Sequence, residues 1–231
     1  MIGTFVISDG VVCTEILSKK LDFLIFDREH GLNSFETIRN QINIASKNCK
    51  TYIRVSKLDY AEIQRATEAK PDGIVVPQIS SIEDAKKAIA YTFYKPKGNK
   101  GLSPYTKAFD YNHQELSKKI RNYNKNTQLV LLIEGKEGLK NLEGIVQTCG
   151  KDIDVIYLGL YDFSQATGVE PDWKNEKIKR SLKVFKKHLD ASDIKFGSIA
   201  RDEQEIKLLK KYGSRFTVYL NDTGIISQSI P

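Results

Sequence analysis

The chain has 231 residues, of which 40% are hydrophobic and 10% aromatic, so it has enough apolar side chains for a sizeable core and is not a disordered polypeptide. Its 36 Lys and Arg residues against 29 Asp and Glu give a formal net charge of +7, which raises the question of an anionic partner such as nucleic acid. We expect no membrane span, because no window approaches roughly 18 consecutive apolar residues, and no secretory signal, because MIGTFVISDG lacks a basic segment and a cleavage site.

Short runs of almost continuously apolar residues recur along the chain, as is typical of strands buried on both faces of a parallel sheet. In chain order, the expected strands are residues 2–7, 23–27, 51–55, 73–77, 128–133, 155–160, 194–197 and 216–220. Segments with helical periodicity lie between them. The clearer ones cover residues 34–47, 81–90, 174–189 and 203–212, and the first two begin with a serine followed by an acidic first turn.

Eight strands alternating with helices in a chain of this length favour a (β/α)8 TIM barrel over an open doubly wound sheet. A dinucleotide-binding fold would also carry a glycine-rich turn after its first strand, whereas residues 7–10 read ISDG. We therefore expect an α/β protein with one barrel domain over residues 1–231. Residues 93–122, which contain two prolines and two glycines, are predicted to form a long loop over one end before a helix near residues 110–121.

Polar side chains follow five successive expected strands at their carboxyl ends, where barrel enzymes place their chemistry. Each of them alone could be a rim salt bridge or a helix cap, but together they predict a functional site. In chain order they are Asp27, Glu29, His30, Arg54, Gln78, Glu134 and Asp162.

Glu134 and Asp162 are the natural metal-binding pair of this set. Carboxylates from adjacent strands suit Mg²⁺ or Mn²⁺, which keep several positions open for water or substrate. His30 is a single histidine, too few for a zinc site built from His or Cys, and we interpret it as a base. His113 and His188 are interpreted as ordinary surface or loop residues.

The positive charge is spread along the chain as lysine pairs on expected helix faces, without a basic stripe, zinc-ligand spacing or RNA-binding motif. We therefore expect no nucleic-acid partner. Cys13, Cys49 and Cys149 are an odd, widely spaced set, which indicates reduced thiols and a cytoplasmic location.

The sequence FLIFDREHG at residues 23–31 resembles the D-x-E-H segment of the HpcH/HpaI aldolase/citrate lyase family, in particular its metal-dependent class II pyruvate aldolases such as hydroxy-oxo-heptanedioate aldolase. Four further segments of this chain resemble motifs of that family and occur in the same order, and the resemblance extends from the N-terminal strand to Asp222. These are IRV at 53–55, GIVVP at 73–77, IE at 133–134 and GLYDFS at 159–164.

The resemblance implies a barrel of the phosphoenolpyruvate/pyruvate-domain type that reversibly cleaves a 4-hydroxy-2-oxo acid to pyruvate and an aldehyde. It implies a divalent cation on Glu134 and Asp162, either Mg²⁺ or Mn²⁺, with Co²⁺ as a further candidate. Arg54 would contact the keto oxygen, His30 would be the base, and Glu68 would hold the imidazole of His30.

The resemblance also implies the surroundings of the site. Asp27 and Glu29 would contact metal-bound water. The expected partner is a small 2-oxo acid substrate, and neither nucleic acid nor a membrane is expected. The expected assembly is a homo-oligomer, either a trimer or a hexamer. The residues implied in substrate binding are Arg54, Gln78, Lys100, Leu160 and Tyr161.

Four positions depart from the family pattern. Leu132 stands in place of a glutamine, Gly135 of Thr or Ser, Lys100 of an arginine, and Leu160 of a proline. The sequence after Asn221 is also shorter than the family's final helix, so we expect a barrel with a shortened C-terminal end and an altered acceptor side of the pocket.

Two other functions stay open. One is a carbon–carbon lyase acting on an acyl-CoA of the citryl or malyl type, against which His30 and Glu29 favour the aldolase branch. The other is a barrel without turnover that acts as a binding scaffold, as the departures at Leu132 and Lys100 would allow.

Overall fold

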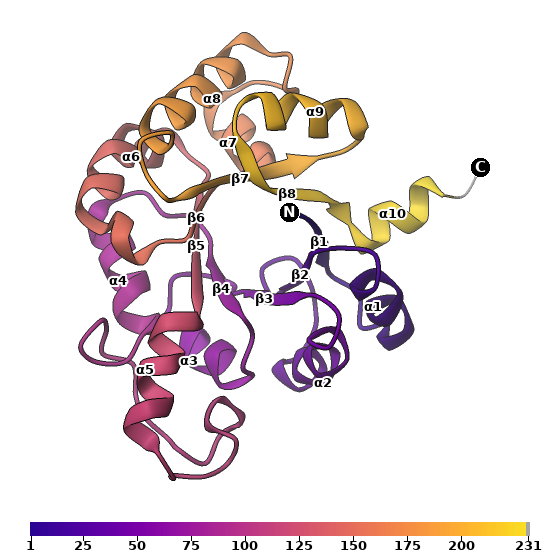
Figure 1. Ribbon diagram of the computed structural model, residues 1–231. Coiled ribbons are helices and arrows are strands. Elements are labelled where there is room, and N and C mark those ends of the chain that lie inside the picture. Colours follow the sequence, from indigo (N-terminus) through magenta and orange to yellow (C-terminus); the bar gives the residue numbers. More distant parts are fainter. Residues whose placement is uncertain (230–231) are drawn as a thin grey trace.

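A computed structural model describes residues 1–229, in which eight parallel strands close into a barrel with the strand order β1 to β8 (Figure 1). The strands are β1 (Ile2–Val6), β2 (Phe23–Asp27), β3 (Lys50–Arg54), β4 (Gly73–Val76), β5 (Gln128–Ile133), β6 (Val155–Leu158), β7 (Lys195–Ala200) and β8 (Ser214–Asn221). Each overlaps a strand expected from the sequence. The predicted (β/α)8 barrel is therefore confirmed, whereas the single domain over residues 1–231 and its shortened C-terminal end stay predictions.

Helices surround the barrel on its outer side (Figure 1). They are α1 (Val11–Ser18), α2 (Phe35–Ala45), α3 (Tyr60–Glu68), α4 (Ile82–Thr92), α5 (Leu116–Asn126), α6 (Lys136–Cys149), α7 (Leu160–Thr167), α8 (Glu176–Leu189), α9 (Glu203–Lys211) and α10 (Asp222–Gln228). Over residues 1–229, none of these helices has both the length and the apolar character that a membrane crossing needs.

Local sequence explains where the clearest helices begin. Ser81 accepts a hydrogen bond from the Asp84 N–H at 3.1 Å, and the Asp84 carboxylate accepts one from the Ser81 N–H at 3.0 Å. This capping box pairs backbone donors that the first turn of α4 would otherwise leave free. Ser34 caps α2 with a single such bond, by accepting from the Thr37 N–H.

The barrel interior is filled by layers of side chains beneath the carboxyl ends of the strands. Phe23 and Phe216 stack with ring centroids 4.0 Å apart, and Tyr52 meets both rings edge-on. Phe5 and Tyr157 lie nearer the carboxyl ends, in edge-to-face contact at 6.3 Å. Phe23, Tyr52 and Phe216 are almost fully buried, so this lower layer is part of the packed barrel core.

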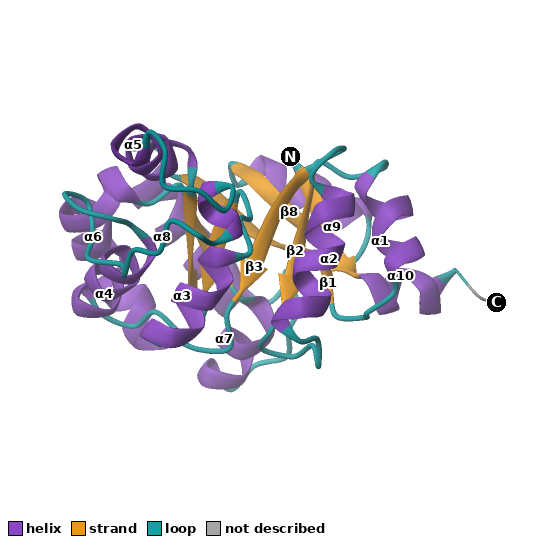
Figure 2. Cartoon of the chain, turned by 90° about the horizontal axis from the view of Figure 1, so that it is seen from below, coloured by secondary structure: helices purple, strands orange, loops and turns teal. Residues whose placement is uncertain are grey.

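The long segment between β4 and β5 differs from its predicted course. Its helix, α5, begins at Leu116 and not near residue 110, because Asp110, Tyr111 and Glu115 have positive φ angles that a continuous helix cannot contain. Figure 2 shows α5 at the end of the barrel opposite to the strand tips and α7. This helix therefore lies away from the carboxyl ends of the strands.

Candidate active site

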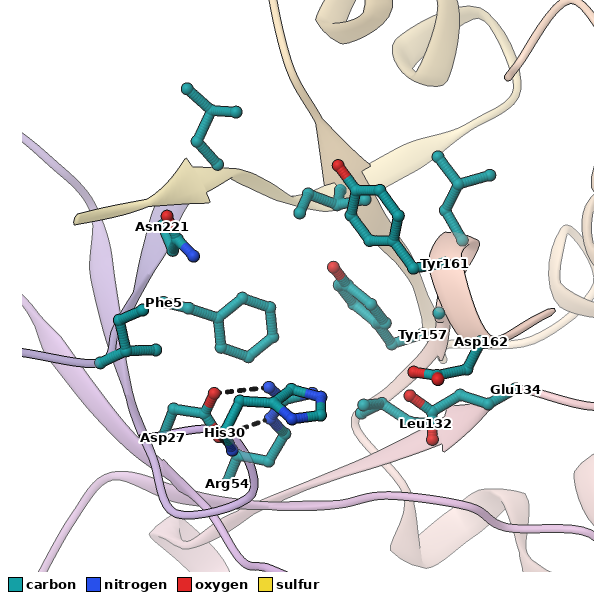
Figure 3. Close-up of a pocket in the computed structure, with 15 residues that line it drawn as sticks. Phe5, Asp27, His30, Arg54, Leu132, Glu134, Tyr157, Tyr161, Asp162 and Asn221 are labelled. Atoms are coloured by element: carbon teal, nitrogen blue, oxygen red, sulfur yellow. Dashed lines mark hydrogen bonds and ion pairs between the residues drawn. The ribbon is translucent and has the colours of Figure 1, made fainter. Parts of the chain in front are cut away.

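A cavity of about 390 Å³ opens among the carboxyl ends of the strands, a size within the usual range of ligand sites (Figure 3). It is lined by Phe5, Ile7, Asp27, His30, Arg54, Leu132, Glu134, Tyr157, Gly159, Leu160, Tyr161, Asp162, Ile199, Leu220 and Asn221. The structure thus brings together most of the site residues that the sequence predicted, from the ends of β2, β3, β5 and β6 and the turns that follow them.

Arg54, the last residue of β3, is fixed by two acidic partners. Its Nε and Nη2 atoms donate to the two carboxylate oxygens of Asp27 at 2.8 and 2.5 Å, and its Nη1 lies 2.9 Å from Glu29 Oε2. Asp27 is fully buried and Arg54 is 6% exposed. The bidentate pair holds the guanidinium in one orientation, with its carbon 4.4 Å from the centre of the Phe5 ring.

The loop after β2 places His30 at the rim of the cavity. Asp27 Oδ1 accepts from the Glu29 N–H at 2.9 Å, which turns the chain sharply after the strand. Arg28 donates to the Asn33 carbonyl at 2.6 Å and stacks on Phe35, which closes the loop. The His30 side chain is exposed and lines the cavity.

Glu134 and Asp162 lie side by side on another wall of the cavity, as Figure 3 shows. Glu134 follows β5 and is 7% exposed, and its Oε2 accepts from the Gln78 N–H at 2.7 Å. Burial raises the pKa of Glu134 to about 7, and the nearby negative charges of Glu29 and Asp162 add to this rise. Two carboxylates this close, one of them buried, repel each other, so a bound cation stabilises their charged forms.

These two residues fit a hard divalent cation. A Cβ added to Gly159 would lie 2.5 Å from Glu134 Cγ and 2.7 Å from its Oε1, so this carboxylate occupies space that only a glycine leaves free. Within residues 1–229 no group of three or more His, Cys, Asp or Glu side chains is placed to hold a metal. Two carboxylates without further protein ligands suit Mg²⁺ or Mn²⁺, which complete their shells with water and substrate oxygens.

Four of the predicted residues do not line the cavity: Glu29, which pairs with Arg54, and Glu68, Gln78 and Lys100. Lys100 has a fully buried ammonium group that donates to Glu68 Oε1 at 2.8 Å and to the Tyr94 hydroxyl at 2.6 Å, and it does not line the cavity. Glu68 is the last residue of α3, which runs away from the strand tips, so its carboxylate pairs with Lys100 and not with His30. Gln78 contacts Glu29 at 3.3 Å from outside the cavity lining.

Part of the cavity wall was missed by the sequence analysis, because its residues are apolar or uncharged. The residues are Phe5, Ile7, Tyr157, Ile199, Leu220 and Asn221. The alternation of inward and outward side chains along each strand could have found most of them. Asp222, a buried carboxylate outside the lining, was also missed: it accepts from the Ile7 and Ser8 N–H groups at 3.0 and 3.1 Å and ties β1 to the end of β8.

Comparison with known proteins gives consistent matches over almost the whole chain. The profile of the HpcH/HpaI aldolase/citrate lyase family matches residues 2–225. A protein of Enterobacter sp. (strain 638) named 5-keto-4-deoxy-D-glucarate aldolase is 26% identical over 223 residues, 93% of this chain and 83% of the relative.

Solved structures agree on the fold. A HpcH/HpaI aldolase/citrate lyase family protein from Burkholderia cenocepacia J2315 superposes with a TM-score of 0.92 at 18% identity, covering 99% of this chain and 91% of the other. The citrate synthase SbnG superposes with a TM-score of 0.87 at 21% identity, covering 99% and 89%.

Proposed function

The chain belongs to the HpcH/HpaI aldolase/citrate lyase family, and from this premise we propose that it is an aldolase that reversibly cleaves a 4-hydroxy-2-oxo acid to pyruvate and an aldehyde. The observation that carries the proposal is the convergence of a fixed arginine, a histidine and two adjacent carboxylates on one cavity. The name of the Enterobacter relative supports the aldolase reaction.

The reaction makes two demands on the site. The proton of the C4 hydroxyl must leave as the C3–C4 bond breaks, so that the aldehyde carbonyl can form. The electron pair of the broken bond is left on C3 and delocalises onto the C2 keto oxygen. An enzyme accelerates this step when it holds positive charge or hydrogen-bond donors at that oxygen in advance.

Arg54 meets the second demand. Its orientation is set by Asp27 and Glu29, so no reorganisation is needed when charge develops on the substrate. The guanidinium carries more N–H groups than those two carboxylates use, and the remaining ones are available to the keto oxygen.

His30 meets the first demand. It lines the cavity from a loop that Asp27 and Arg28 hold in place, and imidazole is the commonest proton acceptor in enzymes near neutral pH. In this role it accepts the hydroxyl proton during cleavage, and this proton, or one exchanged for it with water, is then added to C3 of the enolate to give pyruvate. In the reverse addition a proton leaves the pyruvate methyl group, and the C4 oxygen takes up a proton as the C3–C4 bond forms.

Glu134 and Asp162 would hold the divalent cation, Mg²⁺ or Mn²⁺ with Co²⁺ as a further candidate. When bound, the cation supplies positive charge that polarises the carbonyl of the 2-oxo acid. The protein's own part is to keep the Glu134 carboxylate in the space beside Gly159, where the Gln78 N–H orients one of its oxygens.

The proposal is tested by pyruvate release from a set of 4-hydroxy-2-oxo acids, with and without divalent cation, in wild type, Glu134→Gln and Glu137→Gln. Glu137 is an exposed carboxylate in the first turn of α6 and serves as the matched control. We expect metal-dependent release by wild type and Glu137→Gln, and a loss of about 100-fold or more in Glu134→Gln. Equal activity of all three proteins, or no release from any acid, would contradict the proposal.

Two different outcomes would point to the other functions. Stabilisation of the protein by CoA esters in a thermal shift experiment, without any effect of pyruvate, would favour an acyl-CoA lyase. An absence of stoichiometric metal binding that depends on Glu134 and Asp162 would favour a scaffold without turnover.

A further inference from the structure

The cavity has two chemically different sides (Figure 3). The groups that carry the proposed chemistry come from the turns and ends of β2, β3, β5 and β6. The opposite side comes from β1, β6, β7 and β8 and presents a wall of apolar and uncharged side chains. Its residues are Phe5, Ile7, Tyr157, Tyr161, Ile199, Leu220 and Asn221.

The polar groups on this second side are neutral. Tyr157 is 3% exposed, and burial raises the pKa of its hydroxyl, which therefore stays protonated. The Asn221 side-chain oxygen accepts from the Gly224 N–H at 2.7 Å, as the cap of α10, so its amide nitrogen is left for a ligand. This side can therefore hydrogen-bond a hydroxyl group but offers no charge.

The described residues that line the cavity leave no Lys or Arg free for a second carboxylate. Among the described residues that line the cavity, Arg54 is the one Lys or Arg, and both Asp27 and Glu29 already hold it. Arg201 lies just past the end of β7, but its guanidinium is paired with Glu205 and lines a separate cavity.

The other charged side chains of the lining would repel an anion. Asp27, Glu134 and Asp162 are carboxylates of this one cavity. A carboxylate on the far end of the substrate would lose its hydration against Phe5, Ile199 and Leu220 without gaining a partner. Such burial of an unpaired charge is among the most unfavourable contacts in a protein.

We infer that the aldehyde half of the substrate is uncharged, being an aliphatic or hydroxylated aldehyde without a carboxylate. The inference rests on the proposed aldolase function and names the class of its second substrate. It sets this chain apart from the relative named for 5-keto-4-deoxy-D-glucarate, an acid with a carboxylate at each end.

The test uses the addition direction, with pyruvate, Mg²⁺ and two matched pairs of aldehydes. Butanal is compared with succinic semialdehyde, and glyceraldehyde with 2-hydroxy-3-oxopropanoate, so that in each pair a carboxylate replaces a methyl or hydroxymethyl group. We expect kcat/KM for the uncharged member to be higher by roughly tenfold or more in both pairs. Equal values, or a preference for the carboxylated member, would overturn the inference.

A substitution on the apolar side tests the same idea from the opposite direction. Ile199→Lys places a cation opposite the Glu134 wall, and Ile199→Met is the uncharged control of similar length. The lysine variant should shift the ratio of kcat/KM toward succinic semialdehyde by roughly tenfold, whereas the methionine variant should not. A ratio that does not change in Ile199→Lys would count against a charge-based choice.

Failure of the inference can be told from failure of the aldolase function by following the exchange of pyruvate methyl protons with deuterated solvent in wild type, without any aldehyde. Exchange combined with a preference for carboxylated aldehydes overturns the inference and leaves the aldolase function standing. No exchange and no addition product with any aldehyde overturns the aldolase function, and the inference with it.

Discussion

Replacing Gly159 with alanine should weaken metal binding without unfolding the protein. The added Cβ would lie 2.5 Å from Glu134 Cγ, 2.7 Å from Oε1 and 3.1 Å from Cδ. Ordinary contacts between such atoms are about 3.5–4.0 Å long, so the Glu134 side chain must move by about 1 Å. Gly159 has a φ of −77°, which alanine adopts freely, so the substitution acts through this contact alone.

The size of the effect follows from the role proposed for Glu134. Disturbing the groups that orient a metal ligand typically weakens metal affinity by about 10- to 100-fold, equivalent to about 1.4–2.7 kcal/mol. Isothermal titration with Mn²⁺ measures this loss directly, and circular dichroism with thermal unfolding shows whether the barrel is intact.

Gly135→Ala provides the matched control for this substitution. Gly135 follows Glu134 in the chain, its φ is −145°, and a Cβ there would meet no atom within 4 Å. It should bind Mn²⁺ as wild type does. If Gly159→Ala also kept wild-type affinity, Glu134 would not be a metal ligand held in the position described.

Three further substitutions or conditions test other parts of the site. Arg54→Met should abolish pyruvate release and, because it leaves the buried carboxylate of Asp27 without a partner, lower the free energy of unfolding by about 3–5 kcal/mol in urea titrations. Lys100→Met should lower that free energy by about 2 kcal/mol through the loss of the ion pair with Glu68, while KM for the 2-oxo acid stays unchanged because Lys100 lies outside the cavity. Metal affinity measured across pH should fall by about tenfold per pH unit below 7 and level off above it, because the proton held by Glu134, whose pKa is about 7, must leave before the cation binds.

Each of these three predictions has a clear contrary result. Retained pyruvate release in Arg54→Met would remove the arginine from the proposed chemistry. A raised KM in Lys100→Met, at unchanged stability, would place that lysine in contact with substrate. Metal affinity that does not vary with pH would mean that protonation of Glu134 does not compete with the cation.

The strands could be predicted from the sequence because a parallel barrel buries both faces of each strand, which leaves continuous apolar runs. The residue at which each strand ends could be predicted less accurately. The predicted strand over residues 155–160 ends at Leu158, since Gly159 caps α7 and Leu160 begins it. The helix after the long segment was also displaced, because three residues with positive φ angles have no strong signal in the sequence.

Much of the candidate site could be predicted by the same rule. Asp27 and Arg54 end buried strands and Glu134 follows one, so a closed barrel brings them together even though 107 positions separate Asp27 from Glu134 in the chain (134 − 27 = 107). The pairing of Glu68 with Lys100 could not be predicted, because it depends on how a helix end packs against a loop 32 positions away.

The apolar wall of the cavity was missed for a different reason. Phe5 and Ile199 have the same side chains as the surrounding core, and only their height within the barrel makes them part of the site. Residues that react can be recognised in the sequence from the chemistry of their side chains. Residues that select a substrate by shape or lack of charge can be recognised only in the three-dimensional structure.

The exchange of pyruvate methyl protons with deuterated water, followed by proton NMR in the presence of Mg²⁺, tests the aldolase account most directly because it needs no knowledge of the aldehyde. Wild type should exchange these protons well above the protein-free rate, and Arg54→Met and Glu134→Gln should not. Exchange no faster than in the protein-free control, with Mg²⁺ or Mn²⁺ bound to the protein, would contradict the account.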